Sequence, residues 1–382
     1  MEKFERALVV THVAYRSIPP YDPIEGPANS VCKVLRSSLP SIGFLQIPLV
    51  GFDHPLTRGH FDDQKVTRIP TFLGRIALVK YLLDAILVVY CIVHYSFVNH
   101  GKKMLVIGVD PLSCLPLVFF KKLFGYTLVF YSVDFNRKRF RSTLLQGIYE
   151  WANKMSSKGS DQVWVVSEAL REYQERVYQV PAMHISNAPI FDDRFFRENV
   201  ERRTGNKLGW SGSFMTERQF DIFFTVLKEL QTLRTDLEIY LVPISEHEKF
   251  EAYAQKYGLK RCTILKMYSR SEWQKFVASC DIGVAIYDDQ FDQTKFCEPL
   301  KMWDYLMCGV PFVISQEPSI PPAIRNSGVA YLLDPMNQLP SDDSLREFLR
   351  PENIKKAQNT CLVLAEQFSI KKKIEIALDA LK

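Results

Sequence analysis

The chain has 382 residues, of which 47% are hydrophobic and 24% charged, a composition typical of globular proteins that excludes an intrinsically disordered chain. This length exceeds what one hydrophobic core usually supports, so it favours two domains. The formal net charge of +5 is mildly basic, and no block of like charges forms a tail that binds nucleic acid. We therefore expect no nucleic-acid partner.

Eight cysteines are scattered along the chain without a Cys-x-x-Cys pair or a His/Cys cluster at zinc spacing. This usage predicts reduced thiols, a cytoplasmic protein and no metal site. The first fifteen residues carry charges throughout and lack the apolar core of a signal peptide. The basic sequence at residues 137–141 and the positive net charge are compatible with a peripheral location on the inner face of the cell membrane.

Short apolar runs alternate with longer periodic segments in the first half of the chain. Strands are predicted at residues 7–10, 104–109, 127–131 and 162–166, and helices at residues 30–38 and 115–124. These strands are continuous apolar runs rather than strict alternations. Such runs indicate strands buried on both faces, as in parallel sheets that are covered by helices.

The most apolar segment of the chain lies at residues 76–98. Lys80 and Asp84 interrupt this segment, and the clean apolar run that remains is too short to span a bilayer. The pattern favours a buried helix over a membrane span. A helix that lies in the membrane interface is the alternative.

The same alternation restarts after residue 189. Strands are predicted at residues 207–211, 237–242, 262–265, 282–286 and 311–314, and helices at residues 219–235 and 246–257, with one or two more within 351–382. Two such series in tandem predict an α/β protein with two Rossmann-like, doubly wound parallel-sheet domains that face an interdomain cleft. We expect domains at residues 1–190 and 191–360, and a C-terminal helix at 361–382 that packs back on the first domain.

Residues that follow strands are the first place to search for function, because ligands of open α/β sheets bind at the carboxyl ends of the strands. Gly212 ends a predicted strand and permits a tight backbone turn that could approach a phosphate. The N-terminus of the next predicted helix and the positive charge of Arg218 would attract the same phosphate. An ordinary turn is the alternative. His12 ends the first strand, and a hydrogen-bonded loop residue is its alternative interpretation.

A second candidate region is the predicted helix after Pro299. Helical spacing places Lys301 and Asp304 on one face and Leu300 and Trp303 on the opposite, apolar face. This arrangement predicts an amphipathic helix. An ion pair between Lys301 and Asp304 on a surface helix is the alternative interpretation.

Residues 299–311, PLKMWDYLMCGVP, resemble the donor-site signature of GT-B glycosyltransferases of family 4, in which P-x-K-x-x-E-Y precedes G-x-P-V. Three further segments resemble this family in the expected order. They are Ser211-Gly212-Ser213, DQVWVVS at residues 161–167 and SCDIGVA at residues 279–285. Together these motifs cover nearly the whole chain.

The resemblance implies a GT-B glycosyltransferase of the hexosyltransferase type that uses a nucleotide-sugar as its donor, with no metal or other cofactor. The acceptor would be a glycan or a lipid-linked molecule on the N-terminal domain, in polysaccharide, lipid-linked oligosaccharide or glycolipid synthesis, and a membrane surface would be a further partner. The resemblance and the loop before the first helix place the donor at Gly212, Ser213, Arg218, Lys301, Asp304 and Gly26.

Two positions depart from the family pattern. Phe296 stands where the family has the first of two glutamates, so Glu298 is the candidate catalytic residue on this side. Val133 stands where a catalytic histidine is common, so Asp134 is the candidate base that would activate the acceptor. A helix cap or an ion pair with Arg137 or Arg139 is the alternative role of Asp134.

Three residues are candidates on the acceptor side, namely His12, Arg137 and Arg139. The departures from the family pattern leave two other functions open. One is a catalytically inactive GT-B module that binds a nucleotide-sugar or partners an active enzyme. The other is a nucleotide-sugar epimerase of the same fold.

Overall fold

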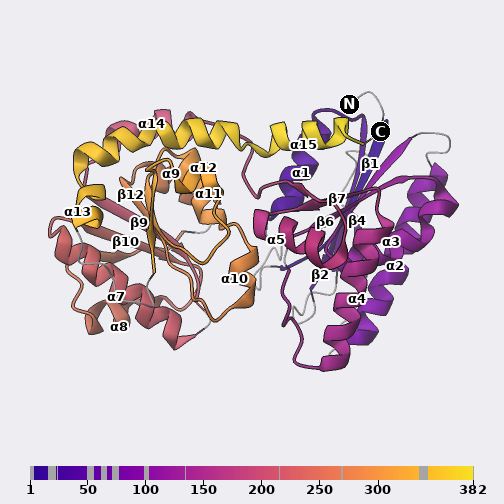
Figure 1. Cartoon of the computed structure of the whole chain (residues 1–382), viewed down its shortest axis with the longest axis horizontal. Helices are drawn as coiled ribbons and strands as arrows, with labels where there is room; N and C mark the ends of the chain where they lie inside the picture. Colours follow the sequence, from indigo (N-terminus) through magenta and orange to yellow (C-terminus); the bar gives the residue numbers. More distant parts are fainter. Residues whose placement is uncertain are drawn as a thin grey trace. The chain divides into compact units, whose positions relative to one another are not determined.

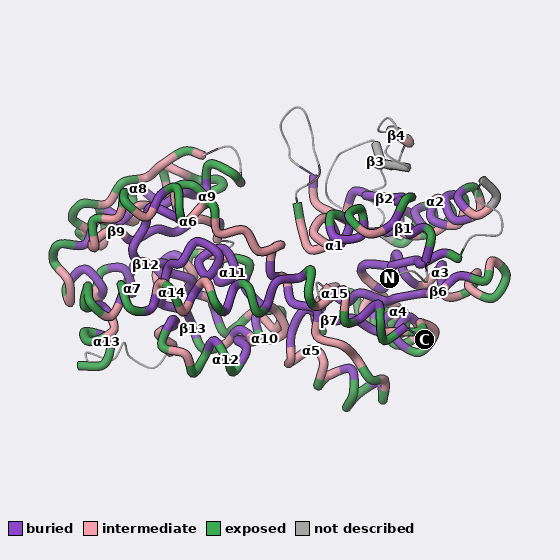
Figure 2. Tube along the Cα trace, turned by 90° about the horizontal axis from the view of Figure 1, so that it is seen from above, coloured by how far each residue is buried: buried purple, intermediate pink, exposed green. Residues whose placement is uncertain are grey.

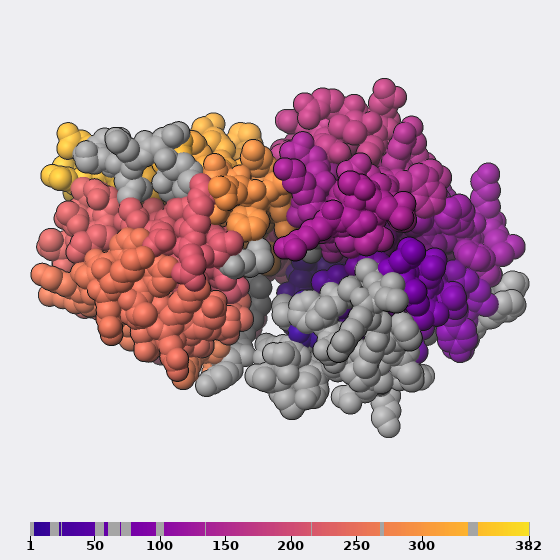
Figure 3. Space-filling model, turned by 90° about the horizontal axis from the view of Figure 1, so that it is seen from below, coloured from indigo at the N-terminus to yellow at the C-terminus, as the bar shows by residue number. Residues whose placement is uncertain are grey.

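A computed structural model describes residues 4–15, 23, 25–49, 56–61, 67–70, 77–98, 103–133, 135–214, 216–267, 270–334 and 343–381. Contacts within the chain divide it into two compact units (Figure 1). Unit 1 comprises Met1–Ser186 and Ile370–Lys382, and unit 2 comprises Asn187–Ser369. These limits differ by four to nine residues from the predicted ends of the domains. In the space-filling view the chain colours of Figure 3 distinguish the two units.

Unit 1 is built on an eight-stranded sheet with the order β4-β3-β2-β1-β5-β6-β7-β8. The strands are β1 (Arg6–Val13), β2 (Ser41–Pro48), β3 (Leu56–Phe61), β4 (Thr67–Pro70), β5 (Met104–Val109), β6 (Thr127–Ser132), β7 (Gln162–Val165) and β8 (Met183–His184). All neighbouring strands are parallel except at β3, which is antiparallel to both of its neighbours. All six residues of β5, MLVIGV, are buried, as expected for a central strand that is covered on both faces.

The helices of unit 1 form two layers. They are α1 (Pro27–Arg36), α2 (Ala77–Val98), α3 (Pro111–Phe124), α4 (Thr143–Gly159), α5 (Glu168–Tyr173) with the π-helical turn η1 (Gln174–Tyr178), and α15 (Ile370–Asp379). α1 connects β1 to β2, and α2 connects β4 to β5 in the opposite direction across the sheet, so right-handed crossovers place the two helices on opposite faces. α3 packs between α2 and α4 in the second layer, whereas α15 packs on α1 (Figure 1).

Unit 2 is built on a six-stranded parallel sheet with the order β11-β10-β9-β12-β13-β14. Its strands are β9 (Lys207–Gly212), β10 (Glu238–Pro243), β11 (Cys262–Ile264), β12 (Ile282–Ala285), β13 (Phe312–Ser315) and β14 (Ala330–Leu333). Its helices are α6 (Arg194–Asn199), the 3-10 turn η2 (Val200–Arg202), α7 (Glu217–Leu233), α8 (His247–Lys256), α9 (Arg270–Ala278), α10 (Asp292–Phe296), α11 (Leu300–Met307), α12 (Pro322–Arg325), α13 (Asp343–Phe348) and α14 (Pro351–Gln367). Figure 2 shows that central strands of both units, such as β1, β12 and β13, are largely buried.

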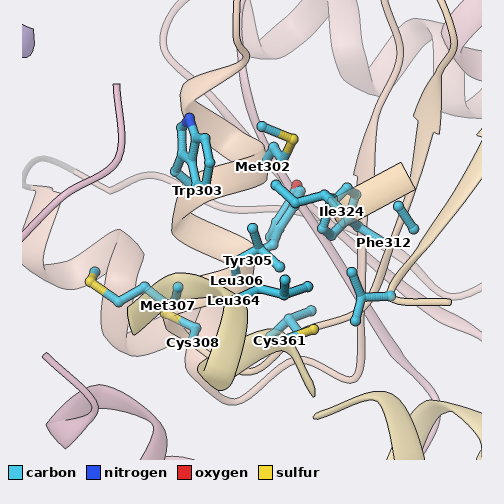
Figure 4. Close-up of a cluster of buried hydrophobic side chains, with 14 of the residues drawn as sticks. Met302, Trp303, Tyr305, Leu306, Met307, Cys308, Phe312, Ile324, Cys361 and Leu364 are labelled. Atoms are coloured by element: carbon cyan, nitrogen blue, oxygen red, sulfur yellow. The ribbon is translucent and has the colours of Figure 1, made fainter. Parts of the chain in front are cut away.

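α11 is buried on nearly every side, which corrects the prediction of an amphipathic helix. Residues 302 to 307 are all buried, because α11 packs against both α14 and the strands beside it (Figure 4). Leu300, which was predicted on the apolar face, is exposed, whereas Asp304 on the predicted polar face is 4% exposed. The interpretation of Lys301 and Asp304 as a surface ion pair is therefore wrong.

Asp161 and Asp281, which lie in two of the motifs, bind backbone N–H groups of neighbouring strands. Asp161 accepts a hydrogen bond from the backbone N–H of Leu128 at 2.8 Å, and Asp281 accepts one from Lys207 at 2.9 Å. Each carboxylate thereby pairs a backbone amide near the start of a neighbouring strand, at the second residue of β6 and at the first residue of β9. These two motif residues are structural in this chain.

Candidate functional site

In unit 2 the end of β9 lies directly against the start of α11. A Cβ atom added to Gly212 would lie 3.0 Å from both Cε and Nζ of Lys301 and 3.0 Å from the ring of Trp210. A side chain at this position would press on the end of Lys301 and on the Trp210 ring, and the φ of 157° at Gly212 is also rare for other residues. The backbone turn after β9 and the ammonium of Lys301 therefore form one continuous surface.

Aromatic rings, rather than carboxylates, surround the Lys301 ammonium. Its Nζ lies 5.7 Å from the ring centroid of Trp210 and 5.4 Å from that of Tyr287, within the range of cation–π attraction. Within the described part of the chain, no carboxylate lies within ion-pair distance of this ammonium. The positive charge of Lys301 is therefore stabilised without being neutralised.

The position of Lys301 at the N-terminus of α11 also favours binding of an anion. Lys301 lies in the first turn of α11, which contains no acidic residue and has no side-chain cap, so the partial positive charge of the helix end is not offset there. Burial lowers the pKa of Lys301 to about 8, although Cys297 and Asp304 act in the opposite direction. An anion with several oxygens, such as a diphosphate, would satisfy both the ammonium and the helix end.

Arg218 stands in a different electrostatic environment. Its guanidinium donates to Asp288 at 2.7 Å and to Asp289 at 3.0 Å, and the side chain of Asp288 is 1% exposed. Two carboxylates outweigh the single positive charge of Arg218. The two predicted phosphate-binding cations are therefore not equivalent, and Lys301 is the stronger candidate.

The N-terminus of α7, which was predicted to face a phosphate, is partly occupied by its own side chains. The Thr216 hydroxyl accepts from the Gln219 N–H at 3.2 Å, and the Gln219 side chain accepts from the Thr216 N–H at 3.2 Å. This capping box also precedes Glu217 in the first turn. Fewer N–H groups remain at this helix end for a ligand than the sequence indicated.

The remaining donor-side candidates of unit 2 flank this surface along the chain. Ser213 is exposed directly after β9, and Asp304 is buried one turn after Lys301 in α11. Glu298 is 2% exposed before α11, and its backbone carbonyl accepts from Asn187 at 3.3 Å. The catalytic role of Glu298 and the donor-binding roles of Ser213 and Asp304 stay predictions.

In unit 1, His12 lies at the centre of a buried polar network. Its Nδ1 is 3.1 Å from Asp110 and 2.8 Å from the Ser113 hydroxyl, and its Nε2 is 3.3 Å from Asp84. Lys80 donates to the same oxygen of Asp84 at 2.6 Å. His12 is hydrogen-bonded through both ring nitrogens, as its alternative interpretation expected, but it lies within β1 and not in a loop. Its role toward an acceptor stays a prediction.

The other unit 1 candidates are dispersed. Gly26 caps α1 and its N–H donates to Asn29 at 3.0 Å, whereas Arg137 is exposed. The Arg139 guanidinium lies 5.4 Å from the ring centroid of Tyr149. Asp134 lies outside the described residues. The roles of these residues toward an acceptor or a phosphate stay predictions.

The His12 network predicts that unit 1 loses stability in alkaline solution. Burial alone lowers the pKa of His12, but Asp110 and Asp84 outweigh it and raise the pKa from 6.5 to about 9. The network therefore contributes fully below pH 6.5, and its contribution is lost as the pH rises through about 9. The total loss is on the order of 3 kcal/mol.

Denaturant titrations at several pH values, followed by hydrogen exchange of unit 1 peptides, would measure how the free energy of unfolding of unit 1 depends on pH. The His12→Gln variant is expected to be less stable at neutral pH and to lack the alkaline loss. An unfolding free energy of the parent protein that does not change over this pH range would contradict the assignment.

Comparison with known proteins identifies the fold. No protein-family model and no curated protein match the sequence. Solved structures match over nearly the whole chain at 11–16% identity, and these neighbours are GT-B glycosyltransferases. The chain therefore has the GT-B fold, as the sequence predicted.

Three of these structures illustrate the likeness. Sucrose-phosphate synthase from Thermosynechococcus elongatus has a TM-score of 0.65 and 13% identity, with 98% of each chain covered. An E. coli trehalose-6-phosphate structure with bound UDP-2-fluoro glucose has a TM-score of 0.63 and 11% identity, with 98% of each chain covered. The lipopolysaccharide outer core galactosyltransferase WaaB has a TM-score of 0.60 and 16% identity, covering 98% of this chain and 99% of WaaB.

Proposed function

We propose that the chain is a glycosyltransferase that transfers a sugar from a nucleotide-sugar donor to an acceptor, and that unit 2 binds the donor diphosphate at Gly212 and Lys301. The observation that carries the proposal is the Lys301 ammonium, which lies near the rings of Trp210 and Tyr287 and against Gly212, with no ion pair to a carboxylate among the residues that the structure describes. The GT-B fold supports it, because the E. coli neighbour has a nucleotide-sugar analogue bound.

The proposed role of Lys301 is to stabilise the leaving group. When the bond between the sugar and the diphosphate breaks, negative charge develops on the phosphate oxygens. A fixed ammonium with few water molecules around it stabilises that charge more strongly than an ammonium in bulk water. Backbone N–H groups at Gly212 and at the start of α11 would share this role, so the chemistry needs no metal ion.

The finer parts of the proposal follow from the sequence. They are membership of glycosyltransferase family 4, hexosyl transfer, and an acceptor that is a polysaccharide, a lipid-linked oligosaccharide or a glycolipid. The last part of the proposal is a cytoplasmic location with peripheral binding to the membrane. Lipid-linked acceptors are consistent with the apolar surface of unit 1 that is described below.

A panel of nucleoside diphosphates and nucleotide-sugars tests this function. We expect one nucleoside diphosphate to raise the melting temperature of the protein, and the matching nucleotide-sugar to be hydrolysed slowly without an acceptor. Binding without hydrolysis or transfer over a broad acceptor panel would favour the catalytically inactive module. Interconversion of two nucleotide-sugars would favour the epimerase, and a protein that binds no nucleotide would contradict all three functions.

A further inference from the structure

Helix α2 of unit 1 has its charges inside and its apolar side chains outside. Lys80 and Asp84 are 4% and 2% exposed and form an ion pair of 2.6 Å. Six large apolar side chains of the same helix are between 38% and 65% exposed, namely Leu78, Val79, Leu82, Leu83, Ile86 and Tyr90. The prediction of a buried helix is therefore wrong for this face, and a surface helix of a soluble protein normally shows the reverse pattern.

The exposed side chains form a continuous stripe. Leu78, Leu82, Ile86 and Tyr90 recur every fourth residue, so they lie on one face of α2. The stripe is about 18 Å long, because about twelve helical steps of about 1.5 Å separate Leu78 from Tyr90. An apolar stripe of this length is unusual on a monomer surface and marks an interaction site.

The neighbouring helices extend the apolar surface. α3 packs between α2 and α4 on the same face of the sheet, so the outer sides of all three helices face the same way (Figure 1). α3 exposes Phe119 and Leu123, and α4 exposes Leu144 and Trp151. We call this surface the α2–α4 face, defined by these four side chains and the six of α2.

The charge of the α2–α4 face identifies the kind of partner. Its helices expose Lys122, Lys154 and Lys158. Within the described residues of these three helices, Glu150 is the one exposed acid, and it accepts a hydrogen bond from Gln146 at 3.0 Å. A second copy of the chain would bring like charges together, whereas anionic lipid headgroups would attract the lysines.

We propose that the α2–α4 face binds the surface of a lipid bilayer that contains anionic lipids. Leu82, Ile86 and Tyr90 enter the boundary between headgroups and acyl chains, and the lysines contact the headgroups. This proposal gives the peripheral location a specific surface, and it is independent of the donor site in unit 2.

α2 lies in the interface rather than across the membrane. Its residues 78–96 are apolar enough to span a bilayer by length and composition, a test that buried helices of soluble proteins also pass. The inner side of α2, however, is tied to the fold, because Asp84 contacts both Lys80 and His12. Crossing the bilayer would separate these charges from their partners at high cost.

Cosedimentation with vesicles tests the proposal. The full-length protein is expected to bind vesicles of phosphatidylcholine with phosphatidylglycerol more tightly than vesicles of phosphatidylcholine alone, and high salt is expected to weaken binding. The double variant Leu82→Glu/Ile86→Glu is expected to bind at least about tenfold more weakly, because two apolar side chains that would enter the headgroup boundary become negatively charged. Both positions are exposed, so the fold should tolerate the change.

A matched control makes the same change elsewhere. Ile244→Glu/Val363→Glu replaces two unit 2 side chains that are 75% and 64% exposed, and this variant should bind vesicles like the parent protein. Equal binding by both double variants, no binding by the parent, or binding that resists alkaline carbonate would overturn the proposal. A parent dimer that Leu82→Glu/Ile86→Glu converts to a monomer, with no vesicle binding, would assign the face to a second copy instead.

The two proposals can fail separately. Leu82→Glu/Ile86→Glu should leave the melting-temperature increase caused by the nucleoside diphosphate unchanged, because the α2–α4 face belongs to unit 1. Loss of vesicle binding with retained nucleotide binding supports the membrane face alone. Retained vesicle binding in a protein that binds no nucleotide would contradict only the proposed function.

Discussion

Replacement of Lys301 by methionine is expected to weaken binding of the nucleoside diphosphate by about 10- to 100-fold. A hydrogen bond that involves a charged group contributes about 1.5–3 kcal/mol, and about 1.4 kcal/mol corresponds to a factor of ten. Methionine keeps most of the volume between Trp210 and Tyr287, so the change removes the charge without leaving a large cavity. Isothermal titration calorimetry with the nucleoside diphosphate found in the panel measures the effect.

Two control variants sharpen this experiment. Lys295→Met makes the same chemical change at an exposed lysine six positions earlier, and it should bind like the parent protein. Arg218→Met should weaken binding less than Lys301→Met, because Asp288 and Asp289 already offset the charge of Arg218. A greater loss in Arg218→Met than in Lys301→Met would show that the diphosphate lies at the start of α7 instead.

Replacement of Asp84 by alanine is expected to destabilise unit 1 by about 3–5 kcal/mol, because it leaves a buried cation without its partner. The side chains of Lys80 and Asp84 are 5% and 3% exposed, and the same Asp84 oxygen lies 3.3 Å from His12. The exposed pair of Lys256 and Asp221 provides the comparison, because Asp221→Ala should cost less than about 1 kcal/mol. Denaturant titrations read by hydrogen exchange measure both effects.

Removal of the Lys80 charge together with the Asp84 charge should restore the stability of unit 1. Lys80→Met combined with Asp84→Leu replaces the ion pair by apolar side chains of similar size, and such replacements are often neutral. We expect the double variant to recover most of the stability that Asp84→Ala loses, with a residual loss from His12. A double variant that is as unstable as Asp84→Ala would mean that the cost comes from packing of α2 and not from the charge of Lys80.

The central strand β5 could be predicted from the sequence, because a strand that is covered on both faces appears as an unbroken apolar run. β5 was predicted at its observed limits, since MLVIGV is an unbroken apolar run that is buried on both faces. The buried strand β2, in which Gly43 and Gln46 interrupt the apolar run, was not predicted, and neither were β3, the edge strand β4 and the helix α4. The buried face of α4 includes Asn153, Ser156 and Ser157, so no apolar period marks it.

The donor site could be predicted only in part. Gly212 and Lys301 were found because one ends a strand and the other lies in a motif. The carboxylates that offset the charge of Arg218 could not be found from the sequence. Asp288 is 70 positions away in the chain and is brought close to Arg218 only because β9 packs beside β12. Sequence spacing carries no information on contacts of that kind.

The apolar segment at residues 76–98 shows the limit of hydropathy. Its length and composition are the same whether the helix is buried, exposed or membrane-bound. Two charges four residues apart in an apolar helix predict a buried pair, and that signal was present in Lys80 and Asp84. The exposed side of α2 emerges only from the fold, because the packing of α3 and the sheet decides which face of the helix is covered.

The most direct test of the donor site is the rate at which an amine-acylating reagent modifies Lys301 at pH 8, measured by mass spectrometry with and without the nucleoside diphosphate. The free protein should react at Lys301, because the pKa of about 8 leaves much of the amine neutral. A saturating nucleoside diphosphate should slow that reaction at least about tenfold and leave Lys295 unchanged. An unchanged rate at Lys301, with the nucleotide bound, would contradict the assignment of the diphosphate to Gly212 and Lys301.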